Sequence, residues 1–187
     1  MAGSKKPDHL VSLLFGDIRQ ALDALKSADD AYHRRAVVHT MFTCIEGVTA
    51  FLKSNAILQA IRDPKLFTPA ELAMLVEHTY ELNDKGCAAA RQKVLPPLPN
   101  LRFAYAMATK HLPDAPVLDV QSSPWQALVQ TGQVRNRITH PKSSSDLTIS
   151  TEEVRQARKV FLWFAQSIVA VVNAISSSVP KRPPLTT

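Results

Sequence analysis

Glycine is scarce in this sequence, with five residues among 187, whereas there are thirteen prolines. Tight hairpin turns rely on glycine, so this balance predicts few hairpins, and the prolines instead mark the ends of helical segments. Only two cysteines are present, Cys44 and Cys87, and they lack the CxxC spacing of a metal or redox site. We therefore expect no disulfide framework, and a reducing cytoplasm is the expected location.

Long hydrophobic runs are also lacking. The N-terminal stretch MAGSKKPDH has no apolar segment of the kind found in secretory signals, so no signal is expected. The longest apolar stretch extends from Val160 to Ile175 and contains Gln166 and Asn173. It is short for a membrane span, which predicts a buried helix and no membrane partner.

An excess of charge is present, but its position weakens any conclusion drawn from it. The formal net charge is +6. Four cations lie near the two ends (Lys5, Lys6, Lys181 and Arg182), and 6 − 4 leaves only +2 for the residues between them. Net charge alone therefore does not identify a nucleic-acid-binding protein.

Hydrophobic periodicity predicts helices throughout the chain. The expected segments are 8–28, 29–61, 68–82, a short one over 101–111, 122–140 and 150–175. Capping boxes are expected at Thr68 with Glu71 and at Ser150 with Glu153. No convincing period-2 pattern is present, and DLTIS (146–150) is the only short strand candidate. We expect a single domain over 8–178, an all-α up-and-down bundle of about five helices, with flexible tails at 1–7 and 179–187.

Three prolines in KVLPPLPN (Lys93 to Asn100) predict a proline-rich loop in the middle of the chain. The apolar stripe of the second helix includes Val37, Met41, Cys44, Val48 and Leu52. In the last helix a seam of apolar residues alternates spacings of three and four: Val154, Ala157, Phe161, Phe164, Ile168, Val171 and Ile175. Both stripes are expected to face the core.

The stretch RNRITHP, residues 135–141, carries the chemistry of this sequence. Pro141 biases the preceding residue away from helical geometry, so the helix should end at His140. Asn136 and His140 are four residues apart and share a face, whereas Arg135 lies about 140° around an ideal helix from His140. For Arg135 and His140 to cooperate, the arginine must swing, the last turn must unwind, or a second copy must supply one of them.

Arginine and histidine together suit RNA cleavage without a metal. An imidazole can take the proton of a ribose 2′-hydroxyl or return one to the leaving oxygen. A guanidinium can hold two phosphate oxygens and stabilise the charge of the transition state. Between Thr131 and Lys142 the sequence has three cations (Arg135, Arg137 and Lys142) and no acid, which predicts a local phosphate-binding patch.

Arg135, Asn136 and His140 match the Arg-Asn-x-x-x-His signature of HEPN-domain proteins, which the chain also resembles in its helical pattern. The resemblance implies a homodimer with a composite cleft and metal-independent endoribonuclease activity that leaves a 2′,3′-cyclic phosphate. It also implies a role as a toxin or in phage defence, with RNA as substrate and an antitoxin or a nucleotidyltransferase as partner. His140 would be the general acid or base, Arg135 the electrostatic group and Asn136 the orienting residue, with Arg137 and Lys142 as accessory cations.

Two alternatives remain open at this point. The same patch could belong to a non-catalytic helical module that binds RNA, a nucleotide or a protein, or its side chains could simply cap carbonyls and pair with acids. Glu46, on the second helix, repeats every seven residues with His39 and Lys53, which is typical of a solvated face. Alternatively, Glu46 pairs with Arg135 or orients His140.

Other sites are not expected. His9, His33, His78 and His111 show no zinc-ligand spacing, and no cofactor motif such as a glycine-rich phosphate loop is found. We therefore expect neither a metal nor a cofactor.

Overall fold

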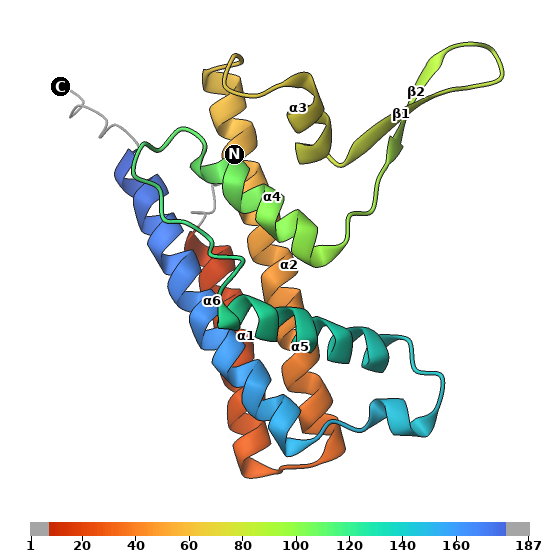
Figure 1. Ribbon diagram of the computed structural model, residues 1–187, viewed down its shortest axis with the longest axis vertical. Helices are drawn as coiled ribbons and strands as arrows, with labels where there is room; N and C mark the ends of the chain where they lie inside the picture. Colours follow the sequence, from red (N-terminus) through yellow and green to blue (C-terminus); the bar gives the residue numbers. More distant parts are fainter. Residues whose placement is uncertain (1–7, 179–187) are drawn as a thin grey trace, which may run out of the picture.

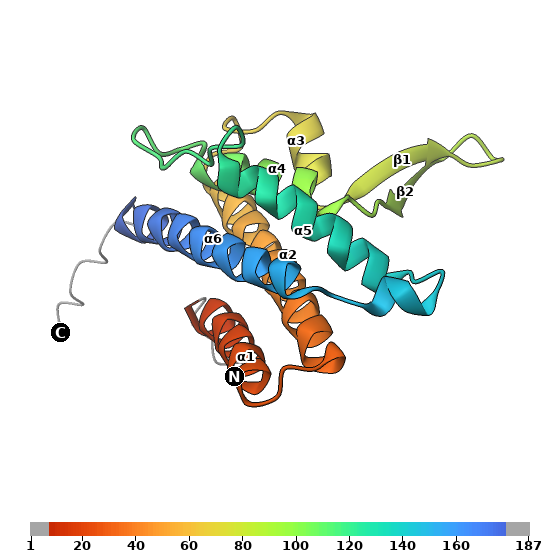
Figure 2. The ribbon, with the colours of Figure 1, turned by 60° about the horizontal axis from the view of Figure 1, so that its bottom comes forward.

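Helix α2 (Ala31–Arg62) is the central element of the computed structural model, which describes residues 8–178. Helix α1 (Asp8–Ser27), α4 (Pro97–Thr109), α5 (Ser123–Thr139) and α6 (Thr151–Ser178) pack around it (Figures 1 and 2). The short α3 (Pro69–Leu75) and the 3-10 helix η1 (Ser144–Leu147) lie in the connections. The described part thus contains six α-helices, where the sequence predicted about five.

The predicted apolar stripes form the core. All five stripe residues predicted for α2 are buried, and six of the seven predicted for α6 are buried. The exception is Phe161, which is partly exposed and packs at 5.5 Å, centroid to centroid, against Phe15 of α1. The stripes of the two longest helices were therefore predicted correctly, because packing against a core requires this periodicity.

Hydrogen-bonded caps mark several helix boundaries. The Asp30 side chain accepts the backbone N–H of His33, and Asp63 ends α2 before Pro64. Thr68 and Glu71 form a reciprocal capping box. At α6, Ser150 Oγ accepts from Glu153 N at 3.2 Å, while Glu153 accepts from Ser150 N at 2.8 Å. These bonds satisfy backbone donors that have no partner within the helix, and they confirm both predicted capping boxes.

The predicted helix over 68–82 is wrong after Leu75. The chain turns at Glu77, whose φ is +55°, and then forms an antiparallel hairpin of β1 (His78–Leu82) and β2 (Ala88–Gln92). In the turn between them, Asn83 Oδ1 accepts from the N–H groups of Lys85 and Cys87, and Gly86 has a φ of +73°. The fold is therefore mostly helical with one small sheet, and the prediction of a chain without strands is corrected.

Two further local predictions need correction. The proline-rich loop is shorter than expected, because α4 begins at Pro97 and its first turn tolerates Pro97 and Pro99, since N–H groups there have no helical partner. The strand candidate at 146–150 is not a strand; its first residues belong to η1. The tails at 1–7 and 179–187 lie outside the described residues.

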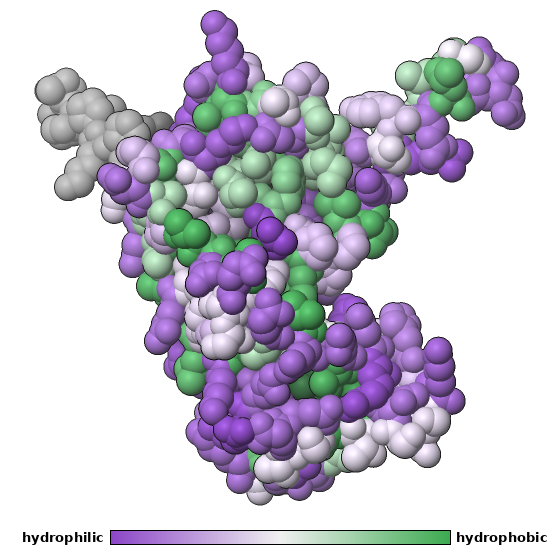
Figure 3. Space-filling view, viewed as in Figure 1, coloured by the Kyte–Doolittle hydropathy of each residue, from purple (hydrophilic) through white to green (hydrophobic). Residues whose placement is uncertain are grey.

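The hairpin projects from the helices as an arm (Figure 1). Most of its side chains are exposed, including Tyr80 and Leu82. At its base, Lys93 N donates to Glu77 O at 2.7 Å. Figure 3 shows a hollow on the right side of the molecule, between the base of this arm and the far end of α5.

Candidate functional site at the end of helix α5

The predicted motif occupies the last turn of α5, as expected. The helix ends at Thr139, and His140 is its C-cap with φ −125° and ψ 60°, while His140 N still donates to Asn136 O at 3.0 Å. Ile138 is buried and fixes this turn to the core. Because His140 has left helical geometry, its side chain is not held at the angle that an ideal helix would give relative to Arg135.

Arg135 is held by two neighbours. Its Nη2 lies 3.0 Å from Glu46 Oε1 on α2, and its Nη1 donates to Asn136 Oδ1 at 3.3 Å. The Arg135 side chain is 24% exposed and that of Glu46 is 46% exposed, so the pair sits at the surface. The pairing of Glu46 with Arg135, one of the two interpretations left open, is present in the structure, and Glu46 and Asn136 together hold the guanidinium.

His140 stands apart from these groups. Its side chain is exposed, and it makes no hydrogen bond or ion pair with any residue that the structure describes, Arg135 and Asn136 included. Within one chain, the structure therefore brings Arg135, Asn136 and Glu46 together but leaves the imidazole open to solvent.

Arg137 has a different role from Arg135. Its Nε donates to Asp146 O at 3.2 Å, its Nη2 donates to Thr148 O at 2.8 Å, and Nη2 also lies 3.0 Å from a carboxylate oxygen of Glu153. These contacts hold the loop between α5 and α6 against the helix. Arg137 was predicted as an accessory site residue, but its Nε and Nη2 are engaged with the loop and with Glu153 of α6.

The loop itself is ordered by Asp146. Its Oδ2 accepts from the backbone N–H of Lys142 at 2.8 Å and of Ser143 at 3.0 Å. These bonds, that from Lys142 first, lower the pKa of Asp146. The ammonium of Lys142 is exposed and has no ion pair within the described residues. Of the accessory cations, Lys142 therefore remains available to a ligand.

The charge of the motif arginine acts on His39 of α2. Loss of hydration on burial, followed by the charges of Arg135 and Arg35, lowers the pKa of His39. Arg35 in turn donates to Leu147 O at 3.1 Å. The positive charges of Arg135 and Arg35 therefore favour the neutral form of His39, although sequence spacing had linked His39 only to Glu46 and Lys53.

Lys53 corrects the prediction of a solvated stripe on α2. Its side chain is only 5% exposed, and its Nζ lies 2.7 Å from Glu77 Oε1 and 3.1 Å from Met74 O. Asn100 Nδ2 donates to the same Glu77 oxygen at 3.3 Å. The bond from Lys53 is the main cause that lowers the pKa of Glu77. A buried lysine therefore anchors the residue at which the chain turns into the hairpin.

A cleft of about 410 Å³ connects these two ion pairs. Glu46 and Arg135 line it on one side, and Glu77 and Asn100 on the other. It corresponds to the region between α2, α5 and the base of the hairpin. Sequence analysis missed Glu77 and Asn100, because no spacing along the chain links them to α2 or α5.

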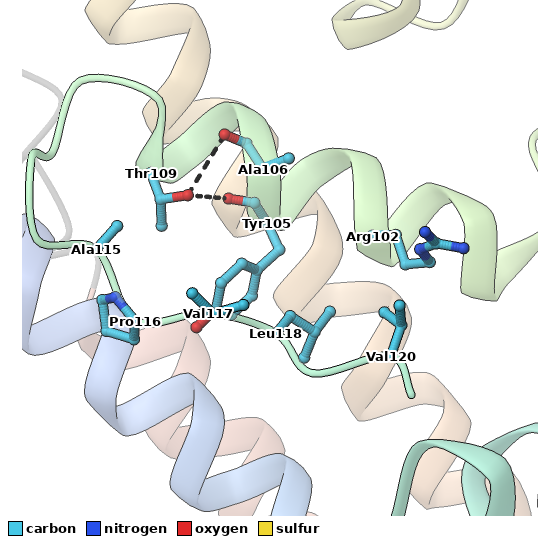
Figure 4. Close-up of a pocket in the computed structure, with 9 residues that line it drawn as sticks. All are labelled: Arg102, Tyr105, Ala106, Thr109, Ala115, Pro116, Val117, Leu118 and Val120. Carbon is cyan, nitrogen blue, oxygen red and sulfur yellow. Dashed lines mark hydrogen bonds between the residues drawn. The ribbon is translucent and has the colours of Figure 1, made fainter. Parts of the chain in front are cut away.

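Another hollow, of about 340 Å³, lies between α4 and the loop that follows it (Figure 4). In Figure 4 the Tyr105 ring extends from α4 toward Pro116 and Val117, while Arg102 points to the other side. Burial raises the pKa of Tyr105, and its hydroxyl has no hydrogen-bond partner among the described residues. This hollow shares no residue with the cleft at Arg135.

A third hollow, of about 600 Å³, lies between α1 and α6 and has a basic lining. Arg155 is engaged with Glu152 and Lys26 with Asp23, whereas Arg158 and Lys159 have no ion pair within the described residues. It likewise contains none of the motif residues.

No group of three or more histidine, cysteine, aspartate or glutamate side chains is arranged for a metal ion within residues 8–178. Helix α6 is the one described helix that is long and apolar enough to cross a membrane, and a third of its most apolar window is buried inside the protein. Core helices of soluble proteins meet the same criterion. Comparison of the chain with family models, curated proteins and solved structures found no match.

Proposed function

We propose that the protein is a HEPN-like endoribonuclease that cleaves RNA without a metal ion and leaves a 2′,3′-cyclic phosphate and a 5′-hydroxyl. The observation that carries the proposal is the arrangement of the Arg-Asn-x-x-x-His motif at the end of α5. There, a guanidinium fixed by Glu46 and Asn136 lies five residues from a solvent-exposed imidazole without a protein partner in the described chain.

The reaction needs a base, an acid and a stabiliser of negative charge. One imidazole takes the proton of the 2′-hydroxyl, whose oxygen then forms a bond to phosphorus. The bond from phosphorus to the 5′-oxygen breaks, and a protonated imidazole gives a proton to that oxygen. Arg135 donates to the non-bridging phosphate oxygens, where charge accumulates in the transition state.

Arg135 can bind phosphate without losing its protein partners. A guanidinium has five N–H donors, and the bonds to Glu46 and Asn136 use two of them. The remaining donors are available to phosphate oxygens. Glu46 is therefore a positioning residue, because it fixes the plane of the guanidinium without touching the reacting atoms.

A second copy of the chain completes the proposed site. One chain provides one His140, whereas base and acid catalysis in a single step requires two titratable groups. Two motif-bearing helix ends facing each other in a homodimer would supply both imidazoles. This arrangement also accounts for the absence of contact between His140 and Arg135 within the described part of one chain.

The test is RNA cleavage in the presence of EDTA by the purified full-length protein. We expect cyclic phosphate products, and loss of cleavage in Arg135→Ala and in His140→Ala. Arg158→Ala and His111→Ala are matched controls on other surfaces and should cleave as the parent does. Cleavage that survives either motif substitution would contradict the assigned roles.

Mixing the parent with the His140→Ala variant tests the composite site. If base and acid are the two His140 imidazoles of one dimer, a dimer of one parent chain and one variant chain is inactive, so excess His140→Ala protein lowers cleavage by the parent. If one chain supplies every group, the added variant leaves cleavage by the parent unchanged.

One observation favours a second function, a helical module that binds phosphate groups of RNA without cleaving it. The Glu46 carboxylate partly neutralises Arg135, and the described residues place no partner on His140 to orient its ring. This function predicts salt-sensitive RNA binding with no product on a gel. It also predicts that His140→Ala binds RNA nearly as well as the parent.

A further inference from the structure

The cleft beside Arg135 has features that a phosphate site does not need. Its polar side chains come from separate parts of the fold: Glu46 and Thr49 from α2, Glu77 from the hairpin base and Asn100 from α4. Two of these are carboxylates, and Arg135 is the cation that lines the cleft with them. Because two carboxylates line the cleft beside a single arginine, it offers hydrogen-bond acceptors, which suit a ligand with N–H donors better than a phosphate group.

Both carboxylates keep an oxygen available. Glu46 Oε1 accepts from Arg135, and Glu77 Oε1 accepts from Lys53 and Asn100. The other oxygen of each carboxylate has no partner among residues 8–178. An ionised carboxylate only accepts hydrogen bonds, so the cleft presents two unused acceptors. The buried Lys53 favours the ionised form of Glu77 and lowers its pKa.

The remaining walls of the cleft are apolar. Val94, Leu95 and Pro97 line it from the segment that links the hairpin to α4, and Ala50 lines it from α2. The Val94 side chain is 91% exposed, which is unusual for a branched apolar residue beside a cleft. Apolar walls with hydrogen-bonding groups at one edge suit a flat heterocycle, since its faces lie against the walls and its edge meets the acceptors.

We propose that this cleft binds one base of the RNA substrate and prefers guanine. Guanine presents two adjacent donors, the ring N1–H and the exocyclic N2 amino group. The Glu46 carboxylate can accept both, because within the described residues its Oε2 is unused and its Oε1, which accepts from Arg135 alone, has a second lone pair. Adenine, cytosine and uracil do not offer that pair of donors on one edge. The phosphate beside the bound base then lies on the other side of Arg135, toward the exposed His140 and the exposed ammonium of Lys142.

The inference rests on the proposed function for the choice of RNA as the ligand. Its test is binding of guanosine 3′-monophosphate to the full chain by calorimetry, with the adenosine, cytidine and uridine monophosphates as comparison ligands. We expect guanosine monophosphate to bind about tenfold more tightly than the others, the discrimination typical of one two-donor contact to a base edge.

Two substitutions locate the binding site. Ala50 is exposed on α2, so Ala50→Phe fills the cleft without removing a polar group or a core residue. Gln126→Phe places the same ring on an exposed position of α5 that does not line the cleft. We expect Ala50→Phe to abolish the preference for guanosine monophosphate and Gln126→Phe to retain it. A preference that persists in Ala50→Phe would overturn the proposal.

Mapping of cleavage positions separates this inference from the proposed function. Cleavage next to guanine in the parent, and without base preference in Ala50→Phe, supports both. Cleavage without base preference in the parent overturns the inference alone. Selective guanosine monophosphate binding without cleavage of any RNA overturns the proposed nuclease and keeps the base pocket. Equal affinity for all four nucleotides overturns the pocket whatever the cleavage result.

Discussion

Arg135 and Arg137 leave opposite sides of the same helical turn and meet different surroundings. Arg135 has one carboxylate and one amide as partners and lines a cleft. Arg137 donates to two loop carbonyls and pairs with Glu153, so its Nε and Nη2 are both used within the protein. Two arginines that look equivalent in the sequence therefore have different roles. Arg135 is available to a ligand, and Arg137 holds the loop after His140 against the helix.

The largest expected effect separates the two arginines by activity. Arg135→Ala should lower RNA cleavage by about 100- to 1000-fold, the usual consequence of removing one transition-state donor. Its thermal unfolding should change little, because the Glu46 pair is at the surface. Arg137→Ala should instead lower the free energy of unfolding by about 1–2 kcal/mol, since carbonyls of the loop lose their donors. Equal losses of activity, without loss of stability in Arg137→Ala, would contradict this division.

The second prediction compares the exposed pair Glu81–Arg91 with the buried pair Lys53–Glu77. Glu77→Gln should lower the free energy of unfolding by about 2 kcal/mol, less than for a fully buried pair because Glu77 is one-third exposed. Glu81→Gln, in the exposed pair with Arg91, should change it by less than about 0.5 kcal/mol. Urea unfolding of both variants measures the difference.

The dependence of stability on pH tests the contribution of the same buried pair, Lys53–Glu77. The pKa of Glu77 is lowered from its usual 4.5, chiefly by its hydrogen bond with Lys53. The stabilisation from this group is therefore complete above 4.5 and is lost as the pH falls through the lowered folded-state pKa. Unfolding measured between pH 7 and pH 3 should show a smaller loss of stability for Glu77→Gln than for the parent. Parallel curves for the two proteins would show that Glu77 contributes nothing to this dependence.

A third prediction concerns the start of α6, next to the loop that Arg137 holds. Ser150→Ala removes the acceptor for Glu153 N and should lower the free energy of unfolding by about 1 kcal/mol. Ser177→Ala, in the last turn of the same helix, is the control and should have no effect. If both serines behave alike, the capping box contributes nothing at this end of α6.

The smallest effect is expected in the hairpin arm. Replacing residues 79–91 with a short glycine-asparagine linker should leave the unfolding temperature of the helices almost unchanged, because a lone two-stranded hairpin adds little stability. Glu77 and Lys93 remain, so the cleft keeps its wall. Loss of cooperative unfolding in this variant would mean that the arm is part of the core after all.

Long periodic segments could be predicted well from the sequence, and short ones could not. The stripes of α2 and α6 repeat over many turns, so that several residues support each assignment. The hairpin was missed because β2 is rich in alanine, which has no preference for strands, and forms only by pairing with β1. The start of α4 was missed because its prolines are typical of a loop and of a first helical turn alike.

Only the part of the candidate site that lies on a single helix could be predicted from the sequence. The position of the motif at a helix end followed from Pro141, and the partnership of Arg135 with Glu46 was one of two interpretations. Four other roles depend on which segments are in contact in the folded chain: those of Arg137, Lys53, Glu77 and Asn100. The local sequence around each residue does not show those contacts. A heptad stripe on α2 indicated a solvated face, yet Lys53 on that stripe is buried.

Helix α2 fixes the distances between three parts of the fold: the loop after the motif, the motif itself and the base of the hairpin. It contacts the loop after the motif through Arg35, the motif arginine through Glu46, and the hairpin base through Lys53. At 1.5 Å per residue, the first two anchors are about 17 Å apart and the last two about 10 Å apart along a single rod. One residue inserted between Arg35 and Glu46 would turn one anchor about 100° relative to the next, so the length of this segment should tolerate no change.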